Sequence, residues 1–268
     1  MDIEPKTFNL DINQLESVIT KRCKAIMTVD LYGHPIDFDR INKIAKKHHL
    51  KVISDSAESL GSLYKNKLTG SQTDVATFSF FGNKIITTGE GGMITTNNKE
   101  LYDKLKLYRD QGKYQKTHMY YHSVIGYNYA MTNLQAAVGI GQLSQLKKLI
   151  RQKRQIATKY KQLLADVPGI SFQQEADYAQ TNWWMFSILI DKKKFGRSRD
   201  ELMQFLKTKN IETRPFFFPM HQLPFYKTKK RFPVTEKISS MGINLPTYAG
   251  LNKSDQDYII ESIKSAKR

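Results

Sequence analysis

Lys84 is the residue whose surroundings in the sequence point most directly to chemistry. It lies in the segment FSFFGNKIITTGEGG, in which the short polar residues Ser79 and Asn83 precede a run of glycines. Glycines allow tight turns and a close approach of the backbone to a ligand. A lysine held among apolar and aromatic neighbours loses solvation, so its pKa falls and its neutral amine becomes a nucleophile toward carbonyls. The segment therefore indicates Schiff-base chemistry, with an ordinary solvated lysine as the alternative.

Two carboxylates form a second candidate group. Asp55 ends the β-rich run LKVISD, and Glu58 follows three residues later, one turn away if the segment is helical. A carboxylate at the end of a strand can hold a heterocyclic nitrogen protonated, as pyridoxal phosphate (PLP) enzymes require for their electron sink. The alternative is that Asp55 caps a following helix.

Strands and helices alternate in the first half of the chain and would position these side chains. Asp37 caps one segment with apolar residues at helical spacing. The alternation predicts an α/β fold with a mixed, mostly parallel sheet. Because ligands gather at the carboxyl ends of parallel strands, Asp30, Asp55 and the segment after Phe80 are the first places to look for a site. The apolar, β-rich runs that predict strands are residues 24–33, 50–55, 74–80 and 92–96.

The second half of the chain indicates a connecting helix and a smaller unit. A Leu/Ile/Ala-rich pattern predicts a long helix from residue 131, with a break near residues 139–141. The predicted domains are a large α/β domain over 1–130, a connecting helix over 131–166 and a small C-terminal α+β domain over 167–268. In the last of these we expect strands over 185–190 and 211–214, helices over 199–209 and 254–267, and a Pro-rich loop over 215–224.

Composition narrows the class of protein. Of the 268 residues, 40% are hydrophobic, which suits a folded chain rather than a disordered one. No stretch is long and apolar enough to span a membrane, and a single cysteine excludes an internal disulfide. We therefore expect a cytoplasmic protein with no membrane partner.

The formal net charge of +17 requires an interpretation of its own. It attracts polyanions, so nucleic acid is the generic candidate partner. The basic residues are scattered in small groups, without zinc-ligand spacing, a basic zipper or an aromatic-interleaved motif. We favour solvated surfaces and a phosphate-bearing small substrate. A nucleic-acid-binding protein, the alternative, would bind DNA or RNA with strong salt dependence.

Six segments, taken together and in order, resemble one family. They are VDLYGHPIDFDRI, KVISDSAESLGSLYKNKLTGSQTDVATFSF, NKIITTGEGGMITTNNKELYDKL, HSVIGYNYAMTNLQAAVGIGQL, ETRPFFFPMHQLP and INLP. The combination resembles the DegT/DnrJ/EryC1/StrS family of PLP-dependent sugar aminotransferases over nearly the whole chain. The resemblance implies PLP-dependent transferase fold type I (aspartate aminotransferase-like) and PLP as the cofactor. It also implies transfer of an amino group from glutamate to a nucleotide-linked 4-keto-6-deoxy sugar, in a homodimer with shared active sites.

The resemblance also implies roles for individual residues. Lys84 matches the lysine that forms a Schiff base with PLP and later moves a proton, and Asp55 matches the aspartate that pairs with the ring nitrogen. Glu58 falls where a Gln or Glu approaches the ring hydroxyl, and Ser79 matches a serine that contacts the cofactor phosphate. Asn128, in GYNYAM, matches an asparagine that reaches the phosphate of the neighbouring subunit's cofactor.

Three further residues are expected near the nucleotide sugar. Arg214 and His221 lie in the TRPFFFPMH segment, and His122 precedes GYNYAM. For these residues the alternatives are a solvated arginine and ordinary loop histidines. His118 and His122 have the i, i+4 spacing of metal ligands, but no third ligand accompanies them, so we expect no metal site.

Two features depart from the family pattern. The family carries a further segment before the point that matches Met1, including a Gly-Thr turn that binds the cofactor phosphate and an aromatic residue that stacks on the ring. Ala130 stands where the family commonly has arginine, which removes a charge near the dimer interface or the substrate. These departures leave an alternative function, that of a catalytically impaired or split homologue acting as a partner subunit or regulator.

Overall fold

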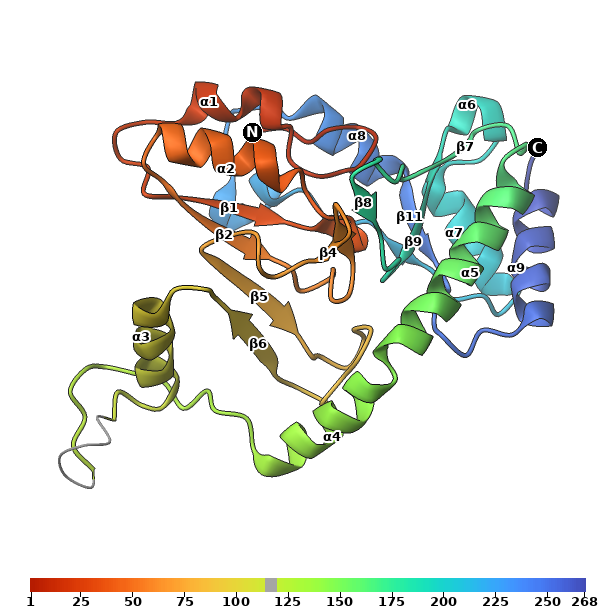
Figure 1. The fold of residues 1–268 in the computed structure, drawn as a ribbon. Coiled ribbons are helices and arrows are strands. Elements are labelled where there is room, and N and C mark those ends of the chain that lie inside the picture. Colours follow the sequence, from red (N-terminus) through yellow and green to blue (C-terminus); the bar gives the residue numbers. More distant parts are fainter. Residues whose placement is uncertain (114–119) are drawn as a thin grey trace.

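The structure is a computed structural model, and it describes residues 1–113 and 120–268. Two larger sheets lie apart from each other, and a rod of two helices runs from one to the other (Figure 1). A small sheet of β3 (Leu63–Tyr64), β4 (Lys67–Leu68) and β8 (Ala179–Gln180) lies between them. Within the described ranges no helix is long and apolar enough to cross a membrane.

The first sheet has the strand order β1-β2-β5-β6. Strands β1, β2 and β5 pair in parallel, and β6 pairs antiparallel with β5, which confirms the mixed, mostly parallel sheet predicted above. Asp55 pairs with Val29 on one side and with Thr77 on the other, while Ser79 pairs with Gly92. The carboxyl ends of the parallel strands therefore meet at one edge. The strands are β1 (Ala25–Val29), β2 (Lys51–Asp55), β5 (Val75–Ser79) and β6 (Gly92–Thr95).

Helices α1 (Leu15–Val18) and α2 (Phe38–Lys47) lie over one face of this sheet (Figure 1). Asp37 caps α2 as predicted, because its side chain accepts a hydrogen bond from the backbone N–H of Arg40 at 3.3 Å. Residues in β1 alternate between exposed and buried, as a strand covered on one face requires. The apolar core beneath the helices includes Ile12, Leu15, Ile26, Phe38, Ile41 and Val52.

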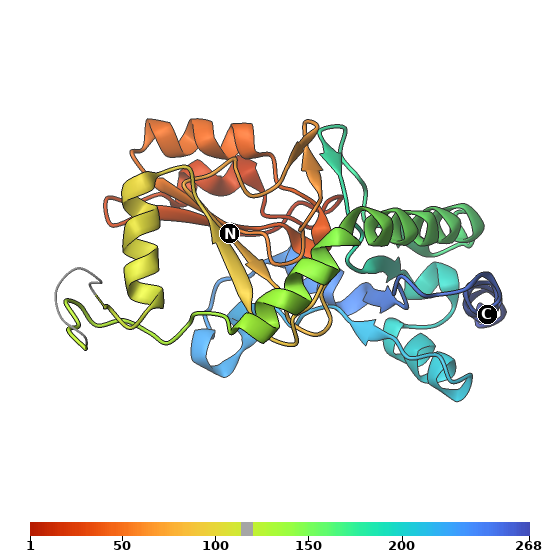
Figure 2. The ribbon, with the colours of Figure 1, turned by 60° about the horizontal axis from the view of Figure 1, so that its bottom comes forward.

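Helix α3 (Lys99–Arg109) follows β6, and α4 (Asn133–Ser144) and α5 (Leu146–Leu164) form the rod (Figure 2). The predicted break near residues 139–141 is wrong, because the chain changes helix at Gln145 instead. Thr132 and Gln135 start α4 with reciprocal side-chain-to-backbone hydrogen bonds. A glycine inside a helix costs about 1 kcal/mol relative to alanine, which is too little to end a helix anchored in this way.

The second sheet has the order β10-β11-β9-β7, with every neighbouring pair antiparallel. Its strands are β7 (Ile170–Phe172), β9 (Phe186–Ile190), β10 (Arg214–Pro215) and β11 (Gly242–Leu245). The strand expected over 211–214 is found only at Arg214, since residues 211–213 precede β10. The accompanying helices are α6 (Lys192–Phe195), α7 (Arg199–Thr208), α8 (Pro233–Met241) and α9 (Lys253–Ser265).

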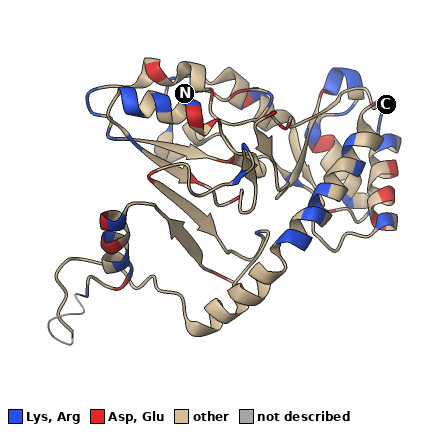
Figure 3. Cartoon of the chain, in the orientation of Figure 1, with Lys and Arg blue, Asp and Glu red and all other residues tan. Residues whose placement is uncertain are grey.

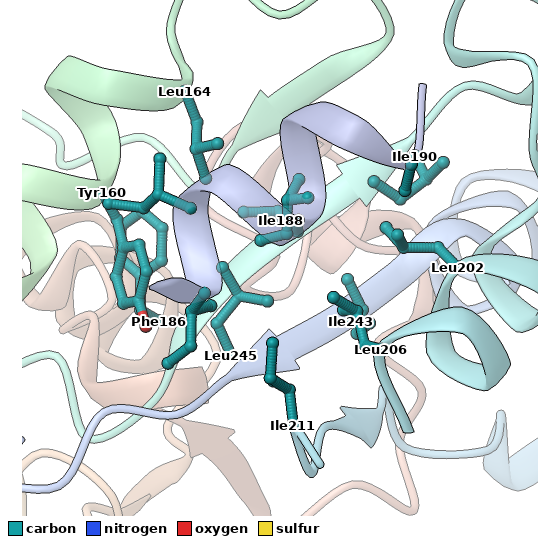
Figure 4. Packing of buried hydrophobic residues seen from close by; sticks show 14 of the residues in the cluster. Tyr160, Leu164, Phe186, Ile188, Ile190, Leu202, Leu206, Ile211, Ile243 and Leu245 are labelled. Carbon is teal, nitrogen blue, oxygen red and sulfur yellow. The ribbon is translucent and has the colours of Figure 1, made fainter. Parts of the chain in front are cut away.

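The core of the second unit joins this sheet to the C-terminal part of α5 (Figure 4). Side chains from α5, α7, β9 and β11 interlock in it, so α5 contributes to this core as well as connecting the two sheets. The domain boundaries 1–130, 131–166 and 167–268 stay a prediction. The cluster includes Tyr160, Leu164, Phe186, Ile188, Ile190, Leu202, Ile243 and Leu245.

Phe186→Ala is expected to lower the free energy of unfolding by about 3–5 kcal/mol, because removing a fully buried aromatic ring leaves a cavity. Phe225→Ala is the matched control, because that side chain is 94% exposed, and it should change the same energy by less than about 0.5 kcal/mol. Urea titrations followed by circular dichroism measure both. Equal effects of the two substitutions would contradict the packing of β9.

Candidate active site

Asp55 ends β2 and is followed by a hydrogen-bonded turn. Its Oδ1 accepts a hydrogen bond from the backbone N–H of Ala57 at 3.1 Å, and the N–H of Ser59 donates to the carbonyl of Ser56 at 3.0 Å. Residues 57–58 and 60–61 form turns, so the alternative that Asp55 caps a helix is wrong. The turn instead places Glu58 beside the edge of the sheet at which Asp55 lies.

Asp30, which follows β1, fixes this turn through hydrogen bonds to its side chains. Its fully buried carboxylate accepts hydrogen bonds from the hydroxyls of Ser56 and Ser59 at 3.0 and 2.6 Å and from the backbone N–H of Ile36 at 3.1 Å. Burial raises the pKa of Asp30 to about 6, although the three donors oppose that shift. Sequence reasoning noted Asp30 only as a strand end. The structure makes it the residue that orients the turn carrying Glu58.

Glu58 is buried, and a backbone N–H in the loop after β1 fixes its carboxylate. Its Oε2 accepts a hydrogen bond from the N–H of Tyr32 at 2.6 Å, and Tyr32 has a left-handed backbone with φ of 54°. Burial raises the pKa of Glu58 to about 7, the Tyr32 donor and the positive charge of Lys84 oppose the shift, and Asp55 and Asp30 add to it. Glu58 is therefore a carboxyl group that changes its protonation near neutral pH.

Lys84 lies half-buried in the loop after β5, where its backbone N–H donates to the carbonyl of Phe81 at 3.0 Å. Its Nζ is 4.0 Å from the centroid of the Trp184 ring. Burial holds the pKa of Lys84 below its ordinary value, and the charges of Glu58 and Asp55 oppose that shift. The structure thus brings Lys84 within electrostatic reach of both predicted carboxylates.

Ser79 ends β5 next to this loop. Its Oγ accepts a hydrogen bond from the N–H of Phe81 at 3.3 Å, and the following N–H, that of Phe80, donates to the carbonyl of Gly91 at 2.9 Å. A side chain at Gly92 would place its Cβ 2.5 Å from the carbonyl oxygen of Phe78, so only glycine allows the two strands to approach this closely. The glycine-rich segment therefore closes the loop that carries Lys84.

A cleft of about 810 Å³ brings Lys84 together with residues from the second unit. Arg214, from β10, lines this cleft, and its contact with the substrate stays a prediction. Trp184 and Tyr248 line it as well. The cleft therefore combines a lysine amine, a guanidinium group and aromatic surface.

Lys153 is a second lysine in the cleft, which sequence reasoning missed. It is buried, and its Nζ donates to the carbonyl of Trp184 at 3.0 Å and to the carbonyl of Thr247. Burial lowers its pKa to about 8. The missed signal is its spacing, because Lys153 falls on the same helical face as the apolar residues Ile150 and Ala157. A lysine at a core-facing position of a helix is expected to be buried and hydrogen-bonded rather than solvated.

His221 is placed in a different environment. It lies in a short 3₁₀ turn, Met220–Gln222, with its Nε2 3.1 Å from Oε1 of Glu236, and both side chains are largely buried. Arg231 binds the same carboxylate. In this chain His221 therefore ties the Pro-rich loop to α8 and is not grouped with Lys84.

Asn128 and His122 lie on the segment that follows α3. Asn128 is exposed and forms a β-bridge with Asp110, at the end of α3. His122 is also exposed, and its Nδ1 lies 2.8 Å from the carbonyl oxygen of Gln111. Neither residue lines the cleft that contains Lys84. His118 lies outside the described residues, and among those that are described no group of three or more His, Cys, Asp or Glu could hold a metal ion.

The family model of the DegT/DnrJ/EryC1/StrS aminotransferases matches residues 1–264. The chain belongs to this family. The aminotransferase resemblance and the fold class predicted from the sequence are confirmed. GDP-perosamine synthases of Escherichia coli O157:H7 and Caulobacter vibrioides are 44% and 41% identical to this DegT/DnrJ/EryC1/StrS member, over 98% of its chain and 71% of theirs.

Solved structures of family members superimpose closely on the chain. The PseC aminotransferase of Helicobacter pylori, involved in pseudoaminic acid biosynthesis, has a TM-score of 0.94 at 29% identity, covering all of this chain and 73% of PseC. The sugar aminotransferase Spr1654 of Streptococcus pneumoniae, described in PLP and PMP forms, has a TM-score of 0.90 at 26% identity, covering 99% of this chain and 74% of the PLP-form chain. These relatives favour an enzyme over the alternative of a non-catalytic partner or regulator.

The residues present at the edge of the sheet fit PLP, the cofactor of these relatives. The fit rests on the chemistry of the groups in place: a half-buried lysine amine with a lowered pKa, a carboxylate at a strand end and a serine hydroxyl beside a glycine-rich loop. These groups match an aldehyde, a ring nitrogen and a phosphate respectively. PLP is the cofactor of this aminotransferase.

The Glu58→Gln variant is expected to become more stable relative to the parent chain as the pH rises. A carboxyl group whose pKa is about 7 in the folded state, against 4.5 ordinarily, binds its proton more tightly when folded, so it stabilises the fold below pH 4.5 and this contribution is lost as the pH rises toward 7. The difference in free energy of unfolding between Glu58→Gln and the parent should therefore shift in favour of the variant by up to about 3 kcal/mol between pH 5 and 8. Urea titrations at both values measure it.

The exposed Glu90→Gln substitution, which removes the same charge from the surface of the neighbouring loop, is the control. The burial of Glu58 would be contradicted if the difference in free energy of unfolding between Glu58→Gln and the parent did not depend on pH. It would also be contradicted if Glu90→Gln showed the same pH dependence.

Proposed function

We propose that this chain transfers the amino group of glutamate to the keto carbon of a nucleotide-linked 4-keto-6-deoxy sugar, with PLP held at Lys84. The observation that carries the proposal is the position of the Lys84 amine, beside the carboxylates of Asp55 and Glu58 and in one cleft with Arg214. The names of the relatives support a sugar substrate, since several are GDP-perosamine synthases and one structure, DesI, was solved with its TDP-sugar product.

Three residues would hold the cofactor. Asp55 would accept a hydrogen bond from the protonated ring nitrogen, Glu58 would interact with the ring hydroxyl, and Ser79 would bind the phosphate. When bound, PLP supplies an electron sink for the charge that develops at the substrate carbon. Asp55 keeps that sink effective, because its negative charge favours the protonated nitrogen.

Lys84 would both hold the cofactor through Nζ and move a proton. With PLP bound, the neutral Lys84 amine would remove the proton from the α-carbon of glutamate. As an ammonium, Lys84 would deliver a proton to the sugar carbon in the second half of the reaction. Burial favours the neutral amine and the neighbouring carboxylates favour the ammonium, so Lys84 is suited to doing both.

Arg214 would bind the diphosphate of the nucleotide sugar, because a guanidinium forms bidentate hydrogen bonds with phosphate oxygens. Its position in the cleft with Lys84 supports this role. His221 would act indirectly, by fixing the Pro-rich loop through Glu236. A contact of His122 with the substrate and a cytoplasmic location stay predictions.

A homodimer would complete the site. Asn128 does not line the cleft of its own chain, and we propose that it reaches the cofactor phosphate in the partner subunit. Helix α4 supports this arrangement, because it carries no charged residue (Figure 3) and exposes Leu134, Val138, Ile140 and Leu143. An exposed apolar stripe of this kind is typical of a protein interface.

The proposed function is tested first by cofactor capture at Lys84. The chain incubated with PLP should absorb in the visible range, and borohydride should fix a pyridoxyl mass on Lys84, with both signals lost in Lys84→Ala. Lys161→Ala is the matched control, because Lys161 is also a partly buried lysine over a tryptophan ring, 4.1 Å from Trp183. A loaded chain should then release 2-oxoglutarate from glutamate and aminate a GDP-linked keto sugar. No adduct, or one elsewhere than Lys84, would overturn the proposal.

The homodimer is tested by Ile140→Asp. A charge placed in the apolar stripe of α4 is expected to convert a dimer to a monomer, because burying an unpaired carboxylate is unfavourable. Light scattering coupled to size-exclusion chromatography measures the mass of the chain and its variant. Phe225→Asp, at an exposed apolar position outside α4, is the control. A parent chain that is monomeric when loaded with PLP would contradict the shared site.

A further inference from the structure

Trp184 makes two contacts with the segment that carries the proposed catalytic lysine. Its indole N–H donates to the carbonyl of Asn83 at 2.7 Å, and the centroid of its ring lies 4.0 Å from Nζ of Lys84. The ring is buried, whereas Lys84 is half-buried and lines the cleft. An ammonium group over a buried indole face is attracted by the electron density of the ring.

Trp184 is itself fixed to the turn that carries Glu58. The fully buried side chain of Asn182 donates through Nδ2 to the carbonyls of Glu58 and Leu60 at 2.8 and 3.0 Å, and its Oδ1 accepts from the N–H of Trp184 at 2.8 Å. A Cβ on Gly33 would lie 2.0 Å from that Oδ1, so the glycine leaves the space that Asn182 occupies. Asn182 thus sets the position of Trp184 relative to Glu58.

A second aromatic ring lies close to the indole. The Tyr32 ring is 6.5 Å from it between centroids, with an angle of 21° between the ring planes. The backbone N–H of Tyr32 is the donor to Glu58 at 2.6 Å. The indole that faces Lys84 is therefore joined to Glu58 by two separate routes, one through Asn182 and one through Tyr32.

We propose that Trp184 is a positioning residue for the Lys84 amine: its ring face holds the ammonium, and its N–H fixes the loop at Asn83. This inference rests on the proposed function of Lys84. The ring gives the amine a defined position when it is not bonded to the cofactor. Burial alone would disfavour the charged amine there, and the ring offsets part of that penalty.

The contact is tested without the cofactor by nuclear magnetic resonance of the 268-residue chain after reductive ¹³C-methylation of its lysines. Methyl groups over an indole face resonate upfield, so among the described lysines strongly shifted signals are expected from Lys84 and from Lys161, whose Nζ is 4.1 Å from the Trp183 ring. Lys84→Arg assigns the first signal. Trp184→Leu should return that signal to the position of the exposed lysines and leave the Lys161 signal in place.

The functional consequence is tested by titrating PLP into the same variants and following visible absorbance. Trp184→Leu should weaken capture up to about tenfold, because the loop that carries Lys84 loses the hydrogen bond that fixes Asn83. Trp184→Phe keeps an aromatic ring but not the N–H, so it should retain part of the upfield shift while its capture of PLP weakens to a similar degree. Because Phe is the closest replacement in shape, it keeps the test valid where the leucine variant fails to fold.

Trp183→Phe is the matched control, because Trp183 is the adjacent buried tryptophan and also lies under a lysine. It should move the Lys161 signal and leave Lys84 and PLP capture unchanged. An unshifted Lys84 signal in the parent, or equal loss of capture in the Trp183 and Trp184 variants, would overturn the inference. A parent that shows the shifted signal but captures no PLP would instead refute the proposed function while supporting the contact.

Discussion

The buried carboxylate of Asp30 is the group on which the geometry of the site depends. It accepts hydrogen bonds from Ser56, Ser59 and the backbone of Ile36, and so joins the end of β1 to the turn after β2. A buried carboxylate is tolerated only where such donors surround it. Because two of these donors, Ser56 and Ser59, lie in the turn itself, satisfying Asp30 also determines where Glu58 lies.

Burial acts in opposite directions on the two groups that this turn brings together. It raises the pKa of Glu58 to about 7 and lowers that of Lys84, and the charge of each group opposes the shift of the other. Glu58 therefore changes its protonation near neutral pH, and the Lys84 ammonium loses its proton more readily than that of a solvated lysine. This balance suits the role proposed for Lys84, which would hold a cofactor as a neutral amine and carry a proton as an ammonium. The second unit contributes to the balance, because Trp184 precedes β9 and lies against Lys84.

The main strands and helices follow from local sequence patterns, whereas the short strands and the exact helix bounds depend on the elements that they contact. Strands β1, β2, β5 and β6 could be predicted because each is a short apolar run that ends at a polar residue or glycine. The four residues of β11 give no comparable signal, because a run this short becomes a strand only by pairing with β9 and β10. The helix break at Gln145 was also missed, since the glycines at 139 and 141 are locally weaker positions that the surrounding helix overrides.

The sequence by itself determined the family, because six segments resemble it in order, and it predicted Lys84, Asp55 and Ser79 as residues that would carry the chemistry. Only the tertiary structure decided what surrounds them. Trp184 and Lys153 meet the lysine loop and its cleft from elements that are distant in the chain, and their roles depend on packing that no local pattern records. The physical reason is that a reactive residue type is a property of one position, whereas its pKa, orientation and partners are properties of the side chains that bury it.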